Sequence, residues 1–161
     1  MKKALVVYYS LSGNTRGVAR KIASRLHADI LEIYTEKDYP DDYDVLLGLG
    51  KRETASGYLP KLKPYRVDYT KYDTIVVGTP VWWGTIAPAM RSFLSSNLAQ
   101  LKGKNVYPFA TNGNWLGRTP SDFKKALRGV ELGQLLNVRF EDKTQVTPNM
   151  GLTDWVKEIA K

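Results

Sequence analysis

A loop rich in hydroxyl and amide groups directly follows the first apolar run of the sequence. Its hydroxyl groups come from Ser10, Ser12 and Thr15. Asn14 adds an amide, and Gly13 lets the backbone wrap closely around a ligand. Hydroxyls combined with the free N–H groups at the start of a helix form a typical phosphate site, although a plain helix cap is the structural alternative. The loop has no Gly-Lys-Ser/Thr of a P-loop and no Gly-x-Gly-x-x-Gly pattern, which argues against hydrolysis of a nucleoside triphosphate.

A second candidate segment contains two adjacent tryptophans. It consists of Thr79, Pro80, Val81, Trp82, Trp83 and Gly84. Because neighbouring side chains diverge, we expect one indole to pack against the scaffold and the other to offer a flat face to a ligand. Stacking on a planar ring contributes about 0.5–1.5 kcal/mol beyond the burial of area. The alternative is that both tryptophans are purely structural.

The third segment combines glycine, amide side chains and another aromatic residue. It includes Thr111, Asn112, Gly113, Trp115 and Gly117. A plain glycine-rich turn would have the same composition. All three segments follow expected strands, and ligands of parallel sheets bind beyond the carboxyl ends of the strands. Together they predict a site for a ligand that is phosphorylated, flat and aromatic.

The elements that position these segments alternate between strand and helix. Five apolar, β-favouring runs separated by amphipathic stretches predict a doubly wound parallel sheet covered on both faces, which makes three layers. We expect one domain over residues 1–161. The expected strands span residues 4–9, 29–34, 74–78, 105–110 and 132–138, and the expected helices include 14–27, 43–54, 89–98, a short helix from 119 and a closing helix over about 152–159.

Three local features complete this expectation. Thr119, followed by Pro120, is expected to cap the short helix, and Thr153 to cap the closing helix. The segment Gly48-Leu49-Gly50 follows no convincing strand, so we do not interpret it as a binding motif. No linker divides the chain.

The composition excludes several kinds of chemistry. The 161 residues include no cysteine and one histidine, His27, which excludes disulfides, thiolate catalysis and cysteine-bound clusters and leaves little for zinc. No residue stands out as a general acid or base, and we assign neither a catalytic residue nor a metal ligand. No apolar run approaches the roughly 20 residues of a membrane span, and the apolar stretch after the basic start at Met1 is too short for a signal peptide. We expect a cytoplasmic protein with no membrane partner.

The net charge of +8 points to an anionic partner. Basic residues gather at Lys51, Arg52, Lys61 and Lys63, and again at 124–128. The second group lies near the expected end of a helix, where basic side chains often form only a solvated face. We do not expect a dedicated nucleic-acid function.

Two segments of the sequence resemble the flavodoxin family. Ser10-x-Ser12-Gly13-Asn14-Thr15 resembles the phosphate signature Thr/Ser-x-Thr/Ser-Gly-Asn-Thr. The run from Tyr72 to Gly84 resembles a small bacterial flavodoxin-like subfamily with a Thr-Pro-x-Trp-Trp-Gly motif, as do residues 39–43 and the third segment. The resemblance covers nearly the whole chain.

This resemblance implies a flavodoxin-like sheet of order 2-1-3-4-5 and FMN as the cofactor. It places the first segment around the phosphate, and the second and third segments on two sides of the isoalloxazine ring. The implied cofactor-binding residues are Ser10, Ser12, Gly13, Asn14, Thr15, Thr79, Pro80, Val81, Trp82, Trp83, Gly84, Thr111, Asn112, Gly113 and Gly117. Electron-shuttling flavodoxins are typically acidic, so the charge of +8 is a departure from the family pattern.

The leading functional hypothesis is FMN-dependent electron transfer to a redox protein or to a small acceptor such as a quinone. The first alternative is an enzyme, an FMN-dependent NAD(P)H oxidoreductase that acts on a quinone or another small molecule. The second alternative is a non-redox module that binds FMN or uses its basic surface for interaction.

Overall fold

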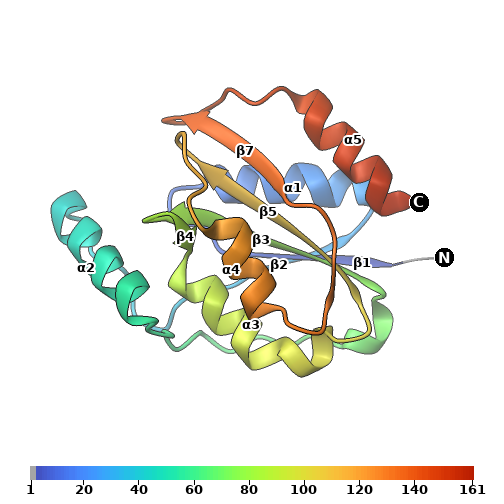
Figure 1. Cartoon of the computed structure of the whole chain (residues 1–161), viewed down its shortest axis with the longest axis horizontal. Coiled ribbons are helices and arrows are strands. Elements are labelled where there is room, and N and C mark those ends of the chain that lie inside the picture. Colours follow the sequence, from blue (N-terminus) through green and yellow to red (C-terminus); the bar gives the residue numbers. More distant parts are fainter. Residues whose placement is uncertain (1–2) are drawn as a thin grey trace.

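The computed structural model describes residues 3–161, so the basic start at Met1 and Lys2 lies outside the described residues. Strands and helices alternate along the chain, as predicted (Figure 1). The strands are β1 (Ala4–Tyr8), β2 (Asp29–Glu32), β3 (Thr74–Trp82), β4 (Thr85–Ile86), β5 (Asn105–Asn112), β6 (Glu131–Leu132), β7 (Leu136–Glu141) and β8 (Thr144–Gln145). The helices are α1 (Asn14–Leu26), α2 (Tyr43–Ser56), α3 (Pro88–Leu101), α4 (Thr119–Ala126) and α5 (Asn149–Ala160), with a 3-10 helix at Tyr69–Lys71.

The sheet runs in the order β2-β1-β3-β5-β7-β8. Its five principal strands, β2-β1-β3-β5-β7, pair in parallel, which confirms the doubly wound fold and the order 2-1-3-4-5. β4 and β8 are short antiparallel additions to β3 and β7. The parallel strands all point their carboxyl ends toward one edge of the sheet, so the loops that follow them meet there.

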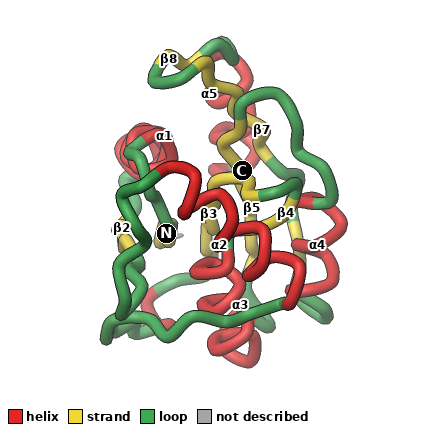
Figure 2. The backbone as a smooth tube through the Cα atoms, turned by 90° about the vertical axis from the view of Figure 1, so that its left-hand side faces the viewer, coloured by secondary structure: helices red, strands yellow, loops and turns green. Residues whose placement is uncertain are grey.

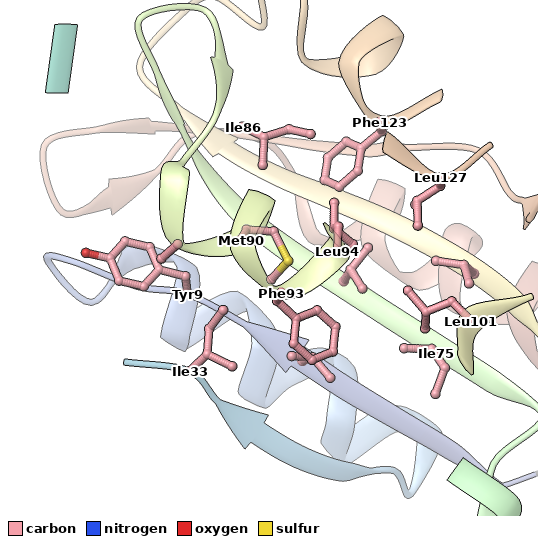
Figure 3. Packing of buried hydrophobic residues seen from close by; sticks show 14 of the residues in the cluster. Tyr9, Ile33, Ile75, Ile86, Met90, Phe93, Leu94, Leu101, Phe123 and Leu127 are labelled. Carbon is pink, nitrogen blue, oxygen red and sulfur yellow. The ribbon is translucent and has the colours of Figure 1, made fainter. Parts of the chain in front are cut away.

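Helices cover both faces of the sheet and so form the expected three layers (Figure 1). Successive side chains of β1 point to opposite faces: Leu5 and Val7 belong to one buried cluster, and Val6 belongs to the other. The first cluster lies under α3 and α4 and contains Met90 and Phe123 (Figure 3). The second cluster lies under α1 and α5. The core therefore fixes the strands whose ends carry the predicted site.

Helix α2 lies apart from these layers, at the edge where the parallel strands end. Figure 2 looks onto this edge and shows α2 passing in front of the central strands. The Asp42 side chain caps the helix by accepting a hydrogen bond from the Val45 N–H, and Gly57 ends it with φ +70°. The helix expected at 43–54 is thus confirmed, and its position adds a wall to the ligand edge.

The expected strand boundaries differ from the structure, by one residue at the end of β1 and by more in the other strands. β3 continues to Trp82, so Thr79–Trp82 belong to a strand and not to a loop, and β2 ends two residues early, at Glu32. The strand expected at 132–138 is split into β6 and β7. The break falls at Gly133, where an added Cβ would lie 2.3 Å from the Tyr107 ring, so the chain must bend around that aromatic side chain.

Both expected threonine caps are wrong. Thr119 is the first residue of α4, and Arg118 holds the N-cap position. The Thr119 hydroxyl caps nothing: it is buried and has no hydrogen-bond partner among the described residues. Thr153 lies inside α5, which begins at Asn149, and its hydroxyl donates 3.0 Å to the Asn149 carbonyl one turn earlier. A threonine next to a proline or an apolar run resembles a cap locally, but tertiary packing moved both helix starts. Within residues 3–161, no helix combines the length and apolar character needed to cross a bilayer.

Candidate functional site

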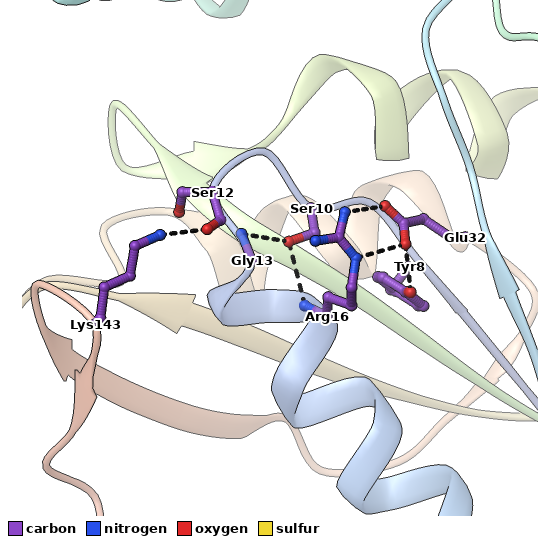
Figure 4. Close-up of polar contacts among 7 residues, drawn as sticks. All are labelled: Tyr8, Ser10, Ser12, Gly13, Arg16, Glu32 and Lys143. Atoms are coloured by element: carbon purple, nitrogen blue, oxygen red, sulfur yellow. Dashed lines mark hydrogen bonds and ion pairs between the residues drawn. The ribbon is translucent and has the colours of Figure 1, made fainter.

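The first segment forms a tight loop between β1 and α1 (Figure 4). The Ser10 hydroxyl accepts hydrogen bonds from the N–H groups of Gly13 and Arg16, both at 3.2 Å. Gly13 stands at φ +104°, a conformation that favours glycine, and turns the chain into the helix at Asn14. The N–H groups of Asn14 and Thr15 have no partner within the helix, since the first turn never supplies one. They are free donors for an anion.

A hairpin turn from far along the sequence closes on this loop. The Asn14 side-chain amide donates 2.8 Å to the Asp142 carbonyl, and the Lys143 ammonium donates to the Ser12 carbonyl (Figure 4 shows the second contact). Both turn residues lie between β7 and β8, with Asp142 at φ +53°. Lys143 therefore brings a positive charge to the phosphate loop, which sequence reasoning missed because no local motif marks it.

Hydrogen bonds at two places, one at Thr15 and one at Arg16, join the loop to the sheet. The hydroxyl oxygens of Thr15 and Thr111 lie 2.8 Å apart and are buried, which joins the start of α1 to the end of β5. Arg16 donates two hydrogen bonds, of 2.8 and 2.7 Å, to the Glu32 carboxylate, and the Tyr8 hydroxyl donates a third at 2.6 Å. Burial alone would raise the pKa of Glu32, but these donors hold it below its ordinary value. The first and third segments are thus held in fixed relative positions.

The second segment ends in a two-residue turn between β3 and β4. Trp83 and Gly84 both have positive φ, +51° and +73°, as a type I′ turn requires. Trp82 is half-buried and meets the edges of Tyr9 and Tyr39, with ring centroids 6.0 and 5.0 Å away. Trp83 is 48% exposed, and its indole Nε1 donates 3.1 Å to the Leu47 carbonyl of α2. Trp82 therefore packs on the scaffold, and Trp83 is the more exposed of the two indoles; a flat face offered to a ligand stays a prediction.

The third segment folds back onto this turn. A Cβ on Gly117 would lie 2.5 Å from the Cα of Gly84, and a Cβ on Gly84 would lie 2.7 Å from the Trp115 ring. The Arg118 N–H donates 2.6 Å to the Gly84 carbonyl. Glycine at 84 and 117 therefore permits the second and third segments to touch.

These elements enclose a cavity of about 490 Å³ at the carboxyl edge of the sheet. Helix α2 contributes Tyr43, Leu46, Leu47 and Gly50, whose spacing of i, i+3, i+4 and i+7 places them on one helix face. The volume lies within the roughly 300–1,000 Å³ range of small-molecule pockets. The remaining lining residues are Leu11, Val81, Trp82, Trp83, Gly84, Asn112, Gly113, Asn114 and Trp115.

The predicted residues divide into those that line this cavity and those that support it. Val81, Trp82, Trp83, Gly84, Asn112 and Gly113 line it. Ser10, Ser12, Gly13, Asn14 and Thr15 form the phosphate loop, which Leu11 connects to the cavity. Thr79 is fully buried; its hydroxyl donates to the Pro80 carbonyl and accepts from the Ala87 N–H. Pro80 and Thr111 pair in the sheet, and Gly117 contacts Gly84, so these residues shape the site from behind.

Several lining residues were not predicted. Leu46, Leu47 and Gly50 of α2 were missed because no motif marks them, although their helical spacing from Tyr43 was available in the sequence. Gly50 lies against the tryptophan hairpin, since a Cβ added there would be in ordinary van der Waals contact with Trp82, at 3.5 Å.

Of the basic group Lys51, Arg52, Lys61 and Lys63, Lys51 lies next to a residue that lines the cavity. The Lys51 ammonium lies 5.4 Å from the Trp83 ring centroid. Arg52 lines a separate shallow pocket, Lys61 pairs with Glu36 at 3.4 Å, and Lys63 lies over the Tyr34 ring. These four basic residues therefore lie in different surroundings and do not form one cluster over the cavity.

The geometry combines a loop that offers hydrogen-bond donors to an anion with an adjoining cavity lined by aromatic side chains.

Comparison with known proteins identifies a family of the same fold. A family model described as Flavodoxin matches residues 3–159. A flavoprotein structure from Bacteroides eggerthii has a TM-score of 0.83 and 24% identity, covering 100% of this chain and 99% of that one. One from Bacteroides uniformis has a TM-score of 0.80 and 24% identity, covering 97% and 98%. A flavoprotein from Lactobacillus acidophilus in complex with FMN has a TM-score of 0.78 and 23% identity, covering 96% and 99%. At these identities the structural likeness establishes the fold.

Proposed function

The chain belongs to the flavodoxin family, and from this premise we propose that it binds FMN and carries out flavin-dependent electron transfer. FMN has two chemical parts that match the two parts of the site. Its phosphate suits the loop of residues 10–15, where free N–H groups, hydroxyls and the nearby Lys143 ammonium favour an anion. A single phosphate loop suits FMN better than riboflavin, which has no phosphate, or FAD, which has two.

The isoalloxazine ring suits the 490 Å³ cavity beside that loop. Trp82 and Trp83 supply aromatic surface on one side, and Asn112 and Gly113 bound the other. Helix α2 closes the outer side through Leu46 and its neighbours. When bound, FMN supplies the redox chemistry, and the protein binds it, orients it and tunes its environment.

We propose that the electron acceptor is small, flat and apolar, such as a quinone, because of the side chains at the rim of the cavity. Five apolar side chains at this rim remain exposed: Leu11 by 43%, Tyr43 by 69%, Leu47 by 38%, Trp83 by 48% and Trp115 by 63%. Such a group of exposed aromatic and aliphatic side chains marks a binding surface. It would hold an apolar ring next to the flavin. We also propose that a redox protein is the alternative partner. The proposed location of the protein is the cytoplasm.

The proposal is tested by reducing the FMN-loaded protein anaerobically with dithionite and then adding a water-soluble quinone. Rapid return of the oxidised flavin spectrum is expected, and Leu47→Ser should slow it because the apolar rim is weakened. Bleaching of the flavin by NADPH alone would show that a nicotinamide dinucleotide is the electron donor, so that the electron transfer is that of an NAD(P)H-dependent reductase. A reduced protein that reacts with neither a quinone nor a redox protein would contradict electron transfer and leave the non-redox module.

A further inference from the structure

A second cavity, of about 640 Å³, is lined in part by β4 of the β3–β4 hairpin. Its walls come from the C-terminal end of α2, from β4, from α3 and from α4. The FMN site described above uses none of its lining residues. Its composition differs sharply from that of the apolar ring cavity.

The walls of this second cavity carry an excess of positive charge. Four basic residues line it, Arg91, Arg118, Lys125 and Arg128, against the single acidic residue Asp122. Asp122 is already engaged: it accepts a hydrogen bond from the Thr85 hydroxyl and lies 3.7 Å from the Arg118 guanidinium. The C-terminal end of α2 adds only about half a negative charge. A ligand in this cavity would therefore meet a positive field.

The two cavities have no lining residue in common, but they are lined by adjacent stretches of the β3–β4 hairpin and of α2. Trp83 and Gly84 line the ring cavity, and the next two residues, Thr85 and Ile86, line the basic one. Along α2, Gly50 lines the first cavity and residues 54–57 line the second. Four helical residues span about 6 Å. An extended ligand held in the basic cavity is therefore long enough to reach toward the ring cavity.

We propose that the basic cavity binds the phosphate groups of a nicotinamide dinucleotide whose ring end reaches toward the ring cavity. This inference rests on the proposed redox function, for which such a dinucleotide would be the source of electrons. Guanidinium groups form forked hydrogen bonds that match phosphate oxygens, and three of the four cations are arginines. The hollow shape favours a small anion that enters the cavity over an acidic protein, which would need a complementary projecting surface.

Lys124 and Lys125 provide a matched pair for the test, because both are exposed on α4 and only Lys125 lines the cavity. Arg118 can be paired in the same way with Arg20, an exposed residue of α1 on the opposite face of the sheet. The double variants Arg118→Gln/Lys125→Gln and Arg20→Gln/Lys124→Gln remove the same charge. Calorimetric titration of the FMN-loaded proteins with NADPH, and with inorganic pyrophosphate, measures binding without relying on turnover.

NADPH should bind the unchanged protein, and pyrophosphate should compete with it. The cavity variant should bind NADPH about tenfold more weakly, whereas the control should stay within about twofold, and the difference should shrink at high salt. Equal NADPH affinity in the two variants would overturn the inference. Binding of pyrophosphate without binding of NADPH would also overturn it and would indicate a simple anion site. If neither probe binds, the inference is likewise overturned, and the basic residues would then serve an acidic protein partner. FMN affinity, measured separately, should be the same in both variants, so a failure of the FMN site would be recognised independently.

Discussion

The indole Nε1 of Trp83 donates a 3.1 Å hydrogen bond to the carbonyl oxygen of Leu47, which joins the β3–β4 turn to α2. Trp83 holds φ +51°, an uncommon conformation for a bulky residue, and such a residue persists where its surroundings fix it. The bond links two walls of the ring cavity that are 36 residues apart in the sequence. We infer that α2 and the tryptophan turn position the flavin ring together.

Trp83→Phe should therefore loosen α2 while keeping an aromatic face. Loss of the hydrogen bond should weaken FMN about threefold to tenfold, since such bonds contribute about 0.5–1.5 kcal/mol. Hydrogen exchange should rise in residues 43–50. Trp155→Phe is the control, because the Trp155 Nε1 donates 2.7 Å to the Gln134 carbonyl far from the cavity. Unchanged exchange in α2 of Trp83→Phe would refute the link.

Lys143→Met should weaken FMN by about tenfold and leave riboflavin unaffected, because the ammonium group lies at the phosphate loop and not at the ring cavity. Parallel titrations of the apoprotein with both flavins measure this selectivity. Lys157→Met, on an exposed position of α5, is the matched control. If both flavins lose affinity equally, Lys143 acts through folding and not through the phosphate.

Gly117→Ala should separate the third segment from the β3–β4 turn. Alanine would have to adopt φ +57° with its Cβ 2.5 Å from the Gly84 backbone, and we expect a loss of at least about 2 kcal/mol in the free energy of unfolding. FMN binding should weaken with it. Gly113→Ala is the control in the same loop, because its Cβ would meet nothing within 4 Å. Urea titration should show a change within about 0.5 kcal/mol for that control.

The Glu32 carboxylate predicts an acid dependence of stability. Its pKa in the folded protein lies below the unfolded value, so its contribution is present above pH of about 4.5 and is lost as the pH falls through the folded pKa. Glu32→Gln should therefore lose less stability than the unchanged protein between about pH 5 and pH 3. Urea midpoints at these two pH values measure the difference. Equal losses in the two proteins would show that Arg16 and Tyr8 do not favour the ionised form.

The sequence specified the sheet because its strands are continuous apolar runs, and it specified the phosphate loop because the local order of residues 10–15 carries that chemistry. The positions of Trp82 and Trp83 were also foreseeable, since adjacent side chains must diverge. Their strand-and-turn conformation was not foreseen, because Pro80 interrupts a run that otherwise favours a strand. Only pairing with β4 and β5 makes residues 79–82 extended.

Other parts of the site depend on contacts between distant residues. The approach of Lys143 to Ser12 joins positions 131 residues apart, and no local pattern announces it. Helix α2 could be predicted as a helix, but its placement across the edge of the sheet depends on contacts with the tryptophan hairpin, such as the hydrogen bond from Trp83 to the Leu47 carbonyl. The basic cavity likewise gathers Arg91, Arg118 and Arg128 from separate segments. Chain folding, and not local sequence, creates these features.

The central claim is that one site holds the phosphate and the ring of FMN. Calorimetric titration of the apoprotein with FMN and with riboflavin, under identical conditions, tests it most directly. We predict one FMN per chain and an affinity for riboflavin that is at least about a hundredfold weaker, because a phosphate held by several charge-assisted hydrogen bonds contributes roughly 3 kcal/mol or more. Equal affinities for the two flavins, or no binding of FMN, would contradict the account.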